Sequence, residues 1–212
     1  MRKIRRWAVP SVLLVVVFAV VLRRALLEGL LSAAAPEEGR WYRVEWITDG
    51  DTIRLAGGVK VRLLGIDTPE KGAPYSRRAT DFLIQRIKNA NVRLEFGPER
   101  TDRYGRTLAW VFDDSGDLIN AEILRAGYGY LYLLGPPPKY GEELLQAQRE
   151  ARAARRGLWS RRRKKCAFYV VAGGVTHRPD CPRLKKMRSR RRVDDLYEAL
   201  DSGAPPCRTC KP

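Results

Sequence analysis

Carboxylates and arginines recur in two short segments of the chain, in a pattern that suits the hydrolysis of a phosphodiester. The first segment runs from Arg62 to Glu70, the second from Arg100 to Arg106, and Asp51 lies upstream of both. Before water can attack the phosphorus, the charge on the phosphate oxygens must be neutralised. A hard cation on oxygen ligands, an acceptor for the water proton and cationic side chains on the phosphate together meet that requirement.

The residue types suggest a role for each position. Asp51 and Asp67 are candidate carboxylate ligands of a hard cation, and Thr68 adds a backbone carbonyl, because such ions prefer oxygen donors. Glu70 follows a proline and is the candidate general base, or the residue that orients the attacking water. Planar guanidinium groups pair well with phosphate oxygens, better than lysine does. The candidates for that role are Arg62 and Arg106.

Alternating and turn-rich segments must position these residues. Apolar and polar residues alternate from Trp41 onward, and Gly57-Gly58 predicts a hairpin whose returning strand runs to Ile66. Further strands are predicted at 92–96 and 107–112, and helices at 76–89, 118–126 and 140–156. Short strands with helices inserted late indicate an α+β fold on a small β-barrel of the OB-fold type. Strand ends meet at the mouth of such a barrel, which would bring Asp51 and Asp67 together.

From about residue 41 to 159 the chain resembles the staphylococcal nuclease (thermonuclease) family. The motifs that carry the resemblance are Thr48-Asp49-Gly50-Asp51-Thr52, Arg62-Leu63-Leu64-Gly65-Ile66-Asp67-Thr68-Pro69-Glu70 and Arg100-Thr101-Asp102-Arg103-Tyr104-Gly105-Arg106, in that order. That family has an OB-type barrel with three helices and a calcium-dependent nuclease activity on DNA and RNA. The resemblance implies that the calcium ligands are Asp51, Asp67 and the carbonyl of Thr68. It also implies that Glu70 assists the water and that Arg62 and Arg106 bind the phosphate.

Two tyrosines are candidates for contact with a nucleotide base. The stretch 128–132 falls where the family stacks a base, which points to Tyr132, and Tyr104 in the last motif is the other candidate. The Tyr/Leu alternation of 128–132 is more typical of an ordinary strand edge. The loop between Glu70 and the helix predicted from residue 76 is shorter than is usual in the family.

All four cysteines and the single histidine lie in the last quarter of the chain. The candidate zinc ligands, in the spacing H-x3-C followed by C-x2-C, are His177, Cys181, Cys207 and Cys210. A module with so small a core needs a metal to fold. Disulfides that include Cys166 are the alternative in an exported chain. The sequence favours structural zinc.

The stretch from about 169 to 212 resembles the metal-binding domain of Ada-type DNA repair proteins. The matching residues are His177-Arg178-Pro179-Asp180-Cys181-Pro182 and Pro205-Pro206-Cys207-Arg208-Thr209-Cys210-Lys211-Pro212. That family uses four cysteines, one of which accepts a methyl group. Because a histidine takes the first ligand position here, the resemblance implies a structural, DNA-binding role rather than methyl transfer.

The positive charge of the chain is concentrated near its C-terminus. The formal net charge is +17, and residues 159–212 carry 15 basic against 5 acidic side chains. Within 183–192, seven of ten residues are basic. Such a run predicts a polyanionic partner, either a nucleic acid or an anionic membrane surface.

The N-terminus has the pattern of an export signal or a membrane anchor. Residues 7–22 carry no charge and are flanked by arginines, and as a helix they would rise roughly 24 Å. The small residues 32–35 lie far beyond the apolar run, which favours an uncleaved anchor with the protein outside the cell over secretion. The predicted parts are a leader and linker at 1–39, a nuclease-like OB-fold domain at 40–159, and a basic hinge with a metal-binding module at 160–212.

These features predict an exported, membrane-tethered, calcium-dependent nuclease that acts on DNA or RNA. The alternative is a nucleic-acid-binding or DNA-capture module with weak catalysis at the cell surface. The presence of both aspartates, the glutamate and both arginines favours the enzyme. The pattern is common to DNA and RNA substrates, and to endo- and exonucleolytic cleavage, and it indicates no protein partner.

Overall fold

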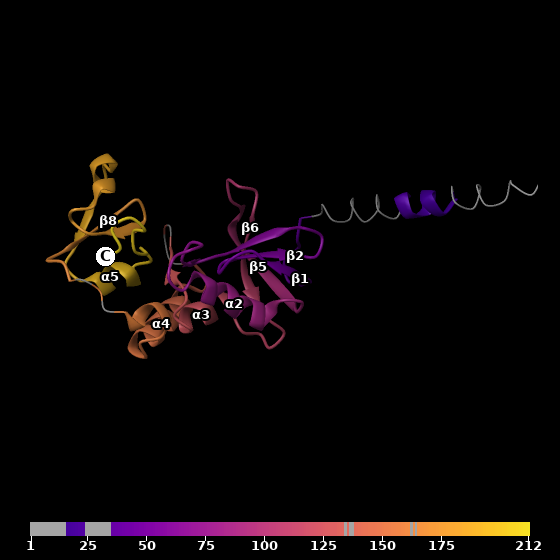
Figure 1. Cartoon of the computed structure of the whole chain (residues 1–212), viewed down its shortest axis with the longest axis horizontal. Coiled ribbons are helices and arrows are strands. Elements are labelled where there is room, and N and C mark those ends of the chain that lie inside the picture. The colour runs from indigo at the N-terminus through magenta and orange to yellow at the C-terminus, as the bar shows by residue number, and fades with distance from the viewer. Residues whose placement is uncertain (1–15, 24–34, 134, 136–137, 162, 164) are drawn as a thin grey trace, which may run out of the picture.

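The computed structural model describes residues 16–23, 35–133, 135, 138–161, 163 and 165–212 (Figure 1). The predicted leader at 7–22 lies mostly outside these ranges, and residues 16–23 form a helix with exposed side chains. Within the described ranges, no helix combines the length and the apolar character needed to cross a bilayer.

Five strands close into a barrel, as the alternating pattern predicts. They are β1 (Trp41–Ile47), β2 (Thr52–Leu55), β3 (Lys60–Leu63), β5 (Asn91–Thr101) and β6 (Thr107–Phe112), in the order β1-β2-β3-β6-β5. Only the pairing of β3 with β6 is parallel among these strands. Alternate residues such as Val92 and Leu94 point inward and are fully buried. This architecture confirms the OB-type barrel.

The strand that was expected to run unbroken to Ile66 is interrupted at Leu64-Gly65. Gly65 has a φ of +73°, and a Cβ there would lie 2.4 Å from Cδ1 of Leu144. The chain therefore leaves the barrel and forms β4 (Ile66–Asp67), which pairs with β7 (Tyr130–Leu131). This break carries Asp67 out of the barrel sheet to its rim. A glycine is required at the break because of both the positive φ and the close contact.

Three helices cover the barrel near the predicted positions. They are α2 (Ser76–Ile87), α3 (Ile119–Arg125) and α4 (Gly141–Ala153), followed by the 3-10 turn η1 (Gly157–Ser160). Apolar side chains at helical spacing bury one face of each, as Leu83 of α2 and Leu144 of α4 illustrate. In α3 the fully buried Asn120 accepts a hydrogen bond from the amide of Val111 and donates one to the carbonyl of Leu64. It thereby holds the chain just before the break that positions Asp67.

The C-terminal module is a small sheet with one helix. Its elements are β8 (Tyr169–Ala172), β9 (Val175–His177), the 3-10 turn η2 (Pro182–Lys186), β10 (Arg191–Val193) and α5 (Leu196–Asp201). The strand order is β10-β8-β9. In Figure 1 the module, coloured orange to yellow, lies beside the lower helices of the barrel domain. It packs there through an apolar cluster that includes Trp159, Leu196 and Leu200.

The contact between module and barrel domain is also polar. The carboxylate of Asp201 in α5 accepts hydrogen bonds from Gln148, Arg149 and Arg152 of α4. The amide of Leu133 donates to the carbonyl of Gly203 at 3.0 Å. These contacts fix the orientation of the C-terminal module against the barrel. As a result, one loop of the module faces the rim of the barrel.

Candidate active site and metal centre

Asp51 lies at the start of β2, and its carboxylate is held at the barrel rim. Its Oδ2 accepts a hydrogen bond from the hydroxyl of Thr68 at 2.8 Å and from the Thr68 amide at 3.1 Å. Gly50 permits this approach, because a Cβ there would lie 2.5 Å from Cβ of Ala79 and 2.8 Å from the Thr68 hydroxyl. Two predicted metal-site residues, Asp51 and Thr68, are therefore in direct contact although they come from different strands.

Arg62 of β3 lies beside Asp51 and is largely buried. Its Nε is 3.2 Å from Oδ1 of Asp51, while Nη1 and Nη2 donate to the carbonyls of Leu63 and Ile66 at 2.6 and 2.8 Å. A guanidinium has five N–H donors, so two remain for a phosphate. The backbone contacts hold the planar group in one orientation before any substrate arrives.

Arg106 is positioned by a residue of its own motif. The carboxylate of Asp102 accepts hydrogen bonds from Nε of Arg106 at 2.7 Å and from the Arg106 and Tyr104 amides at 3.0 and 2.9 Å. Burial raises the pKa of Asp102, but these hydrogen bonds outweigh it and the net pKa is lowered. The Asp102 carboxylate is thus anionic at neutral pH. It orients Arg106, whose Nη1 also lies 3.4 Å from the Thr52 hydroxyl.

Asp67 and Glu70 share one cationic neighbour. The Arg208 guanidinium, from the C-terminal module, donates to Oδ1 of Asp67 at 2.7 Å and to Oε1 of Glu70. Burial raises the pKa of Asp67; the charge of Arg208 opposes this shift, and the nearby charge of Asp51 adds to it. The Asp51 and Asp67 carboxylates therefore repel each other, and a cation bound by both would relieve that repulsion.

The predicted residues line a single cleft of about 1020 Å³ between the barrel and the C-terminal module. Its lining includes all six candidates of the barrel, namely Asp51, Arg62, Asp67, Thr68, Glu70 and Arg106. Both candidate tyrosines, Tyr104 and Tyr132, line it too, and Tyr104 is 70% exposed. The module contributes Arg183 and Arg208. The structure therefore brings together residues that are far apart in the sequence.

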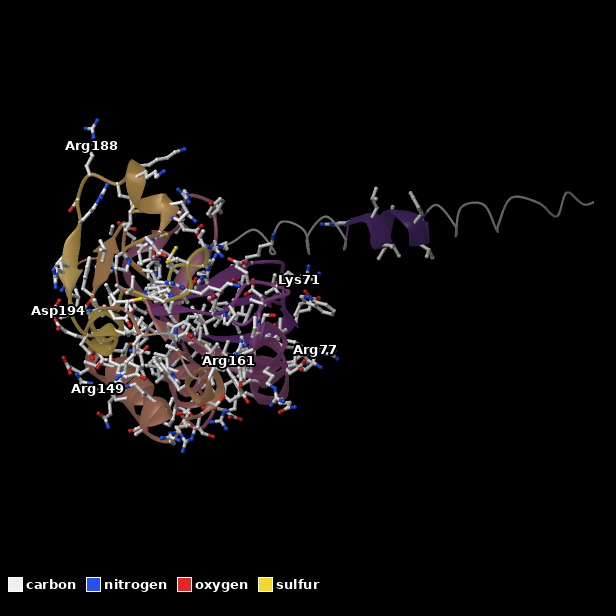
Figure 2. The ribbon with its side chains drawn as sticks, turned by 60° about the vertical axis from the view of Figure 1, so that its left-hand side comes forward. Lys71, Arg77, Arg149, Arg161, Arg188 and Asp194 are labelled. Atoms are coloured by element: carbon white, nitrogen blue, oxygen red, sulfur yellow. The ribbon has the colours of Figure 1, made fainter. Side chains whose placement is uncertain are left out.

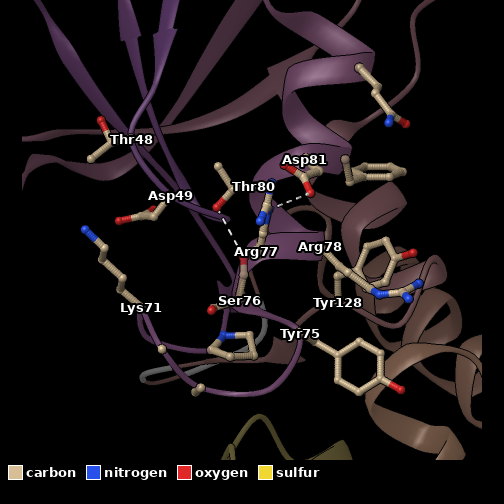
Figure 3. A pocket seen from close by; sticks show the side chains of 15 residues that line it. Thr48, Asp49, Lys71, Tyr75, Ser76, Arg77, Arg78, Thr80, Asp81 and Tyr128 are labelled. Carbon is tan, nitrogen blue, oxygen red and sulfur yellow. Dashed lines mark hydrogen bonds and ion pairs between the residues drawn. The ribbon is translucent and has the colours of Figure 1, made fainter.

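A second hollow adjoins this cleft and is shown in Figure 3. It lies between the loop after Glu70 and the start of α2, and it shares Thr48, Asp49 and Lys71 with the cleft. Tyr75 and Tyr128 form part of its wall, with ring centroids 6.5 Å apart. A flat, basic and aromatic lining of this kind suits the backbone and bases of a nucleic acid.

The oxygen donors fit a hard cation. Aspartate carboxylates and a backbone carbonyl are ligands that calcium accepts. Asp51 and Asp67 both line the cleft, and the Asp67 carboxylate has one oxygen, Oδ2, without a hydrogen bond to any described residue. A calcium ion is therefore compatible with Asp51, Asp67 and Thr68.

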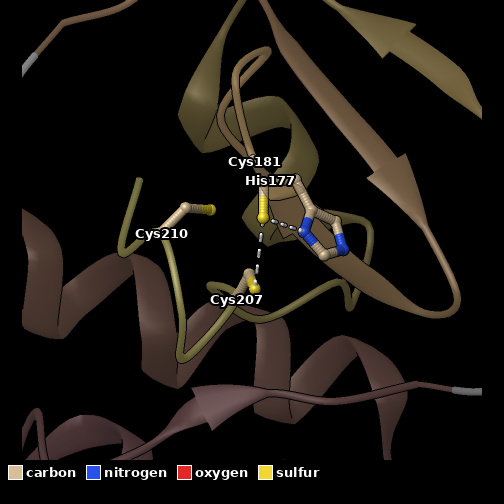
Figure 4. Close-up of side chains that lie close together, drawn as sticks. All are labelled: His177, Cys181, Cys207 and Cys210. Carbon is tan, nitrogen blue, oxygen red and sulfur yellow. Dashed lines mark hydrogen bonds between the residues drawn. The ribbon is translucent and has the colours of Figure 1, made fainter. Parts of the chain in front are cut away.

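The predicted zinc ligands converge in the C-terminal module (Figure 4). Ligand atoms of His177, Cys181, Cys207 and Cys210 all lie within 4.8 Å of one another. Nδ1 of His177 is 3.3 Å from Sγ of Cys181, which is 4.0 Å from Sγ of Cys207. Ligand atoms of a tetrahedral zinc site are separated by ~3.5–4 Å, given bond lengths of ~2.0–2.3 Å. The donor set fits zinc.

The environment of His177 favours metal binding. The imidazole is fully buried, and burial lowers its pKa, which keeps the ring in the neutral form that binds metals. Its Nε2 lies 3.3 Å from the carbonyl of Ala172 and so carries the proton, leaving Nδ1 for the cluster. All four cysteines are free, and Cys166 lies outside the cluster. The convergence of this imidazole with three sulfur atoms fits the donor set of a zinc site.

Comparison with known proteins identifies the family of the barrel domain. A family model described as "Staphylococcal nuclease homologue" matches residues 60–161. The thermonuclease of Staphylococcus hyicus is 35% identical over 128 residues, which cover 56% of this chain and 75% of that protein. The thermonuclease of Staphylococcus intermedius is 33% identical over 164 residues, which cover 71% of this chain and 96% of that protein. The chain belongs to the staphylococcal nuclease family.

Membership of the staphylococcal nuclease family confirms the predicted enzyme class, a hydrolytic nuclease. An uncharacterized endonuclease of Escherichia coli O157:H7 is also 36% identical over 123 residues, which cover 56% of this chain and 76% of that protein. The family match lies in the barrel domain, and the Ada-type resemblance of the C-terminal module stays a prediction.

Two residues of the site have no role in the sequence analysis. The position of Asp102 could have been recognised in the sequence, because it lies just before a Tyr-Gly turn and four residues ahead of an arginine. An aspartate in that position can accept hydrogen bonds from both the turn and the guanidinium. Arg208 has no such signal. Its contact with Glu70 spans 138 residues of sequence and depends on how the C-terminal module packs.

Proposed function

We propose that this nuclease hydrolyses DNA or RNA in a calcium-dependent reaction, within the cleft between its barrel and its C-terminal module. The observation that carries this proposal is the convergence of six charged or oxygen-bearing candidates on one cleft. The thermonuclease and endonuclease relatives support a nucleic acid as the substrate.

In this proposal the two aspartates and the carbonyl of Thr68 hold the calcium. Bound there, calcium supplies positive charge against the phosphate oxygens and lowers the barrier to attack by water. Asp51 is fixed for this role by its contacts with Thr68 and Arg62. The exposed carboxylate of Glu70 accepts a proton from the attacking water or orients that water toward the phosphorus.

Arg62 and Arg106 bind the phosphate in this proposal. Both guanidinium groups are oriented by hydrogen bonds within the protein and keep free N–H donors. Because they are already ordered, they stabilise the charge that develops on the phosphate with little reorganisation. Tyr104 and Tyr132 line the same cleft and serve as stacking partners for the bases beside the scissile bond.

The C-terminal module has a structural zinc centre and a nucleic-acid-binding surface in this proposal. Three thiolates and the imidazole of His177 hold the zinc. The seven basic side chains within 183–192 are all exposed, and Figure 2 shows Arg188 projecting outward from the end of the module. Phosphate contacts made by such side chains are independent of sequence and weaken with salt.

Export and membrane tethering are also proposed, on the charge pattern of the N-terminus alone. The uncharged stretch 7–22 between arginines supports a signal or anchor that directs the remainder of the chain outside the cell.

The experiment that tests the proposed chemistry compares the protein with its Glu70→Gln variant on a labelled single-stranded DNA. The unmodified protein is expected to cleave with calcium present and not when calcium is omitted. Glu70→Gln is expected to lose at least a hundredfold in kcat while it still binds the oligonucleotide. Glu99→Gln, the same change at an exposed position of β5, is the matched control and should cleave normally. Binding without cleavage under every condition would instead support the capture module.

A further inference from the structure

The C-terminal module places a third arginine in the nuclease site. Arg208 lies inside the Cys207–Cys210 segment of the metal cluster and lines the cleft. Its Nη2 donates to Oδ1 of Asp67 at 2.7 Å, and its Nη1 donates to Oε1 of Glu70. One guanidinium therefore bridges the candidate metal ligand and the candidate water-orienting residue.

Glu70 depends on this contact for its orientation. Its side chain is 64% exposed, and among the described residues Arg208 is the only side chain that bonds its carboxylate. A free glutamate in that position would sample several rotamers, and only some of these direct the carboxylate at the attacking water. The bridge to Arg208 selects one arrangement of Glu70 relative to Asp67.

The bridge to Arg208 leaves one oxygen of each carboxylate available for the reaction. Arg208 bonds one oxygen of each carboxylate, so Oδ2 of Asp67 and Oε2 of Glu70 make no hydrogen bond to another described residue. In metal sites, a ligating carboxylate commonly has its second oxygen bonded to an outer residue that orients it. Arg208 has this relation to Asp67 and at the same time holds Glu70.

Arg208 is itself held by an ordered backbone. The amide of Cys207 donates to the carbonyl of Thr176 at 2.7 Å, and the amide of Lys211 donates to the carbonyl of Cys207 at 2.9 Å. Cys207 is buried within the cluster of zinc ligands. The module is in turn fixed to α4 through Asp201. The position of the guanidinium thus follows from the packing of the whole module.

We propose that Arg208 is a positioning residue of the nuclease site, so that the site is completed by the C-terminal module. This inference rests on the proposed roles of Asp67 and Glu70. A planar guanidinium spans two carboxylates with separate N–H groups, which a lysine ammonium does less well. Arg208 acts through the carboxylates, whereas Arg62 and Arg106 act on the phosphate.

The test is a kinetic comparison of Arg208→Ala, Arg208→Lys and Thr209→Ala in the full chain at saturating calcium. Loss of an outer residue that orients a metal ligand lowers activity about 10–100-fold. Arg208→Ala is expected to lower kcat by that factor and to change KM less than about threefold. Arg208→Lys should recover part of kcat. Thr209→Ala, at the exposed neighbouring position in the same segment, should match the unmodified protein and so control for disturbance of the cluster.

A binding measurement without turnover separates positioning from a direct phosphate contact. In the Glu70→Gln background, Arg208→Ala should leave the Kd of a single-stranded oligonucleotide unchanged, and calorimetry with calcium alone should still detect binding. A tenfold or larger rise in the oligonucleotide Kd would assign Arg208 to the phosphate and overturn the proposal. An unchanged or increased kcat for both Arg208 variants would also overturn it.

The two proposals fail in different ways. If the unmodified protein does not cleave with calcium, or if Glu70→Gln cleaves normally, the proposed chemistry is wrong. If both of those results are as expected but neither Arg208 variant loses kcat, only the role of Arg208 is wrong. Arg208→Lys keeps the test decisive if Arg208→Ala does not fold.

Discussion

Replacement of Asp201 by alanine tests how firmly the C-terminal module is held to the barrel domain. The Asp201 carboxylate is 13% exposed and accepts hydrogen bonds from three residues of α4. The distances are 3.0 Å from Gln148, 3.0 Å from Arg149, and 2.7 and 3.0 Å from the two terminal nitrogens of Arg152. Removing the carboxylate takes away the acceptor of all four hydrogen bonds.

The structure allows the cost to be worked out donor by donor. Arg152 is 21% exposed and partly rehydrates, so the two hydrogen bonds of its bidentate pair together contribute about 1.5–3 kcal/mol. Arg149 is 51% exposed and rehydrates, so it adds less than about 1 kcal/mol. Gln148 keeps a hydrogen bond to the carbonyl of Leu200 and adds little. The expected loss is therefore about 2–3 kcal/mol.

Urea unfolding measures this loss. With an m-value of about 2 kcal/mol/M, the midpoint of Asp201→Ala should fall by about 1–1.5 M. Asp194→Ala is the matched control, because that carboxylate belongs to the same module but is 77% exposed and, among the residues that the structure describes, pairs only with Arg192. Its effect should stay within about 0.5 kcal/mol. If Asp201→Ala changed stability no more than Asp194→Ala, the polar contact with α4 would not hold the module.

Three further predictions concern stability, pH and metal. Asn120→Ala removes the partner of the buried Val111 amide and of the part-buried Leu64 carbonyl at about 1–3 kcal/mol each, so urea unfolding should show a loss of about 2–6 kcal/mol; a loss below 1 kcal/mol would contradict the role of this side chain. Burial raises the pKa of Glu95, but hydrogen bonds from Lys139 and Tyr140 lower it to about 2. The ionised Glu95 carboxylate therefore contributes fully to stability above pH ~4.3, and this contribution is lost as the pH falls toward 2. The free energies of unfolding of Glu95→Gln and of the unmodified protein should differ at neutral pH and become equal near pH 2; a constant difference at all pH values would contradict this role. Elemental analysis should find one zinc per chain in the unmodified protein and less in His177→Ala. If the protein instead contains no zinc and its mass is lower by two hydrogens for each pair of cysteines, the cysteines form disulfides.

Local patterns in the sequence determined most of the barrel domain. Alternation predicts the barrel strands because each has one buried face, as Val92 and Leu94 show. Helical spacing predicts the three helices for the same reason, and the ends differ by a few residues because the last turns are set by tertiary contacts. The motifs around Asp51, Asp67 and Arg106 are equally local, so their residue types alone predicted a phosphate-cleaving site.

The break at Leu64-Gly65 shows where local patterns stop. The apolar run through Ile66 is compatible with one continuous strand, and Gly65 is the one local sign of a break in it. The close approach of Leu144 and the hydrogen bond from Asn120 to the Leu64 carbonyl decide the matter. Both contacts come from helices distant in sequence, and they determine which sheet Asp67 joins.

The zinc cluster lies between these cases. The identities of its four ligands follow from spacing in the sequence, yet only the fold shows that their donor atoms meet and that His177 turns Nδ1 toward them. Cys166, equally capable by residue type, packs instead against the apolar cluster that includes Trp159.

The residues proposed for the chemistry are thus determined by the sequence itself, because each role demands a particular side chain at a particular position of a strand or turn. The completion of the site was decided by the tertiary structure alone. Arg208 reaches Asp67 and Glu70 only because α5 packs on α4 and carries the metal cluster to the barrel rim. Such a contact depends on the packing of two separate units, and no periodicity or spacing along the chain records how two units pack.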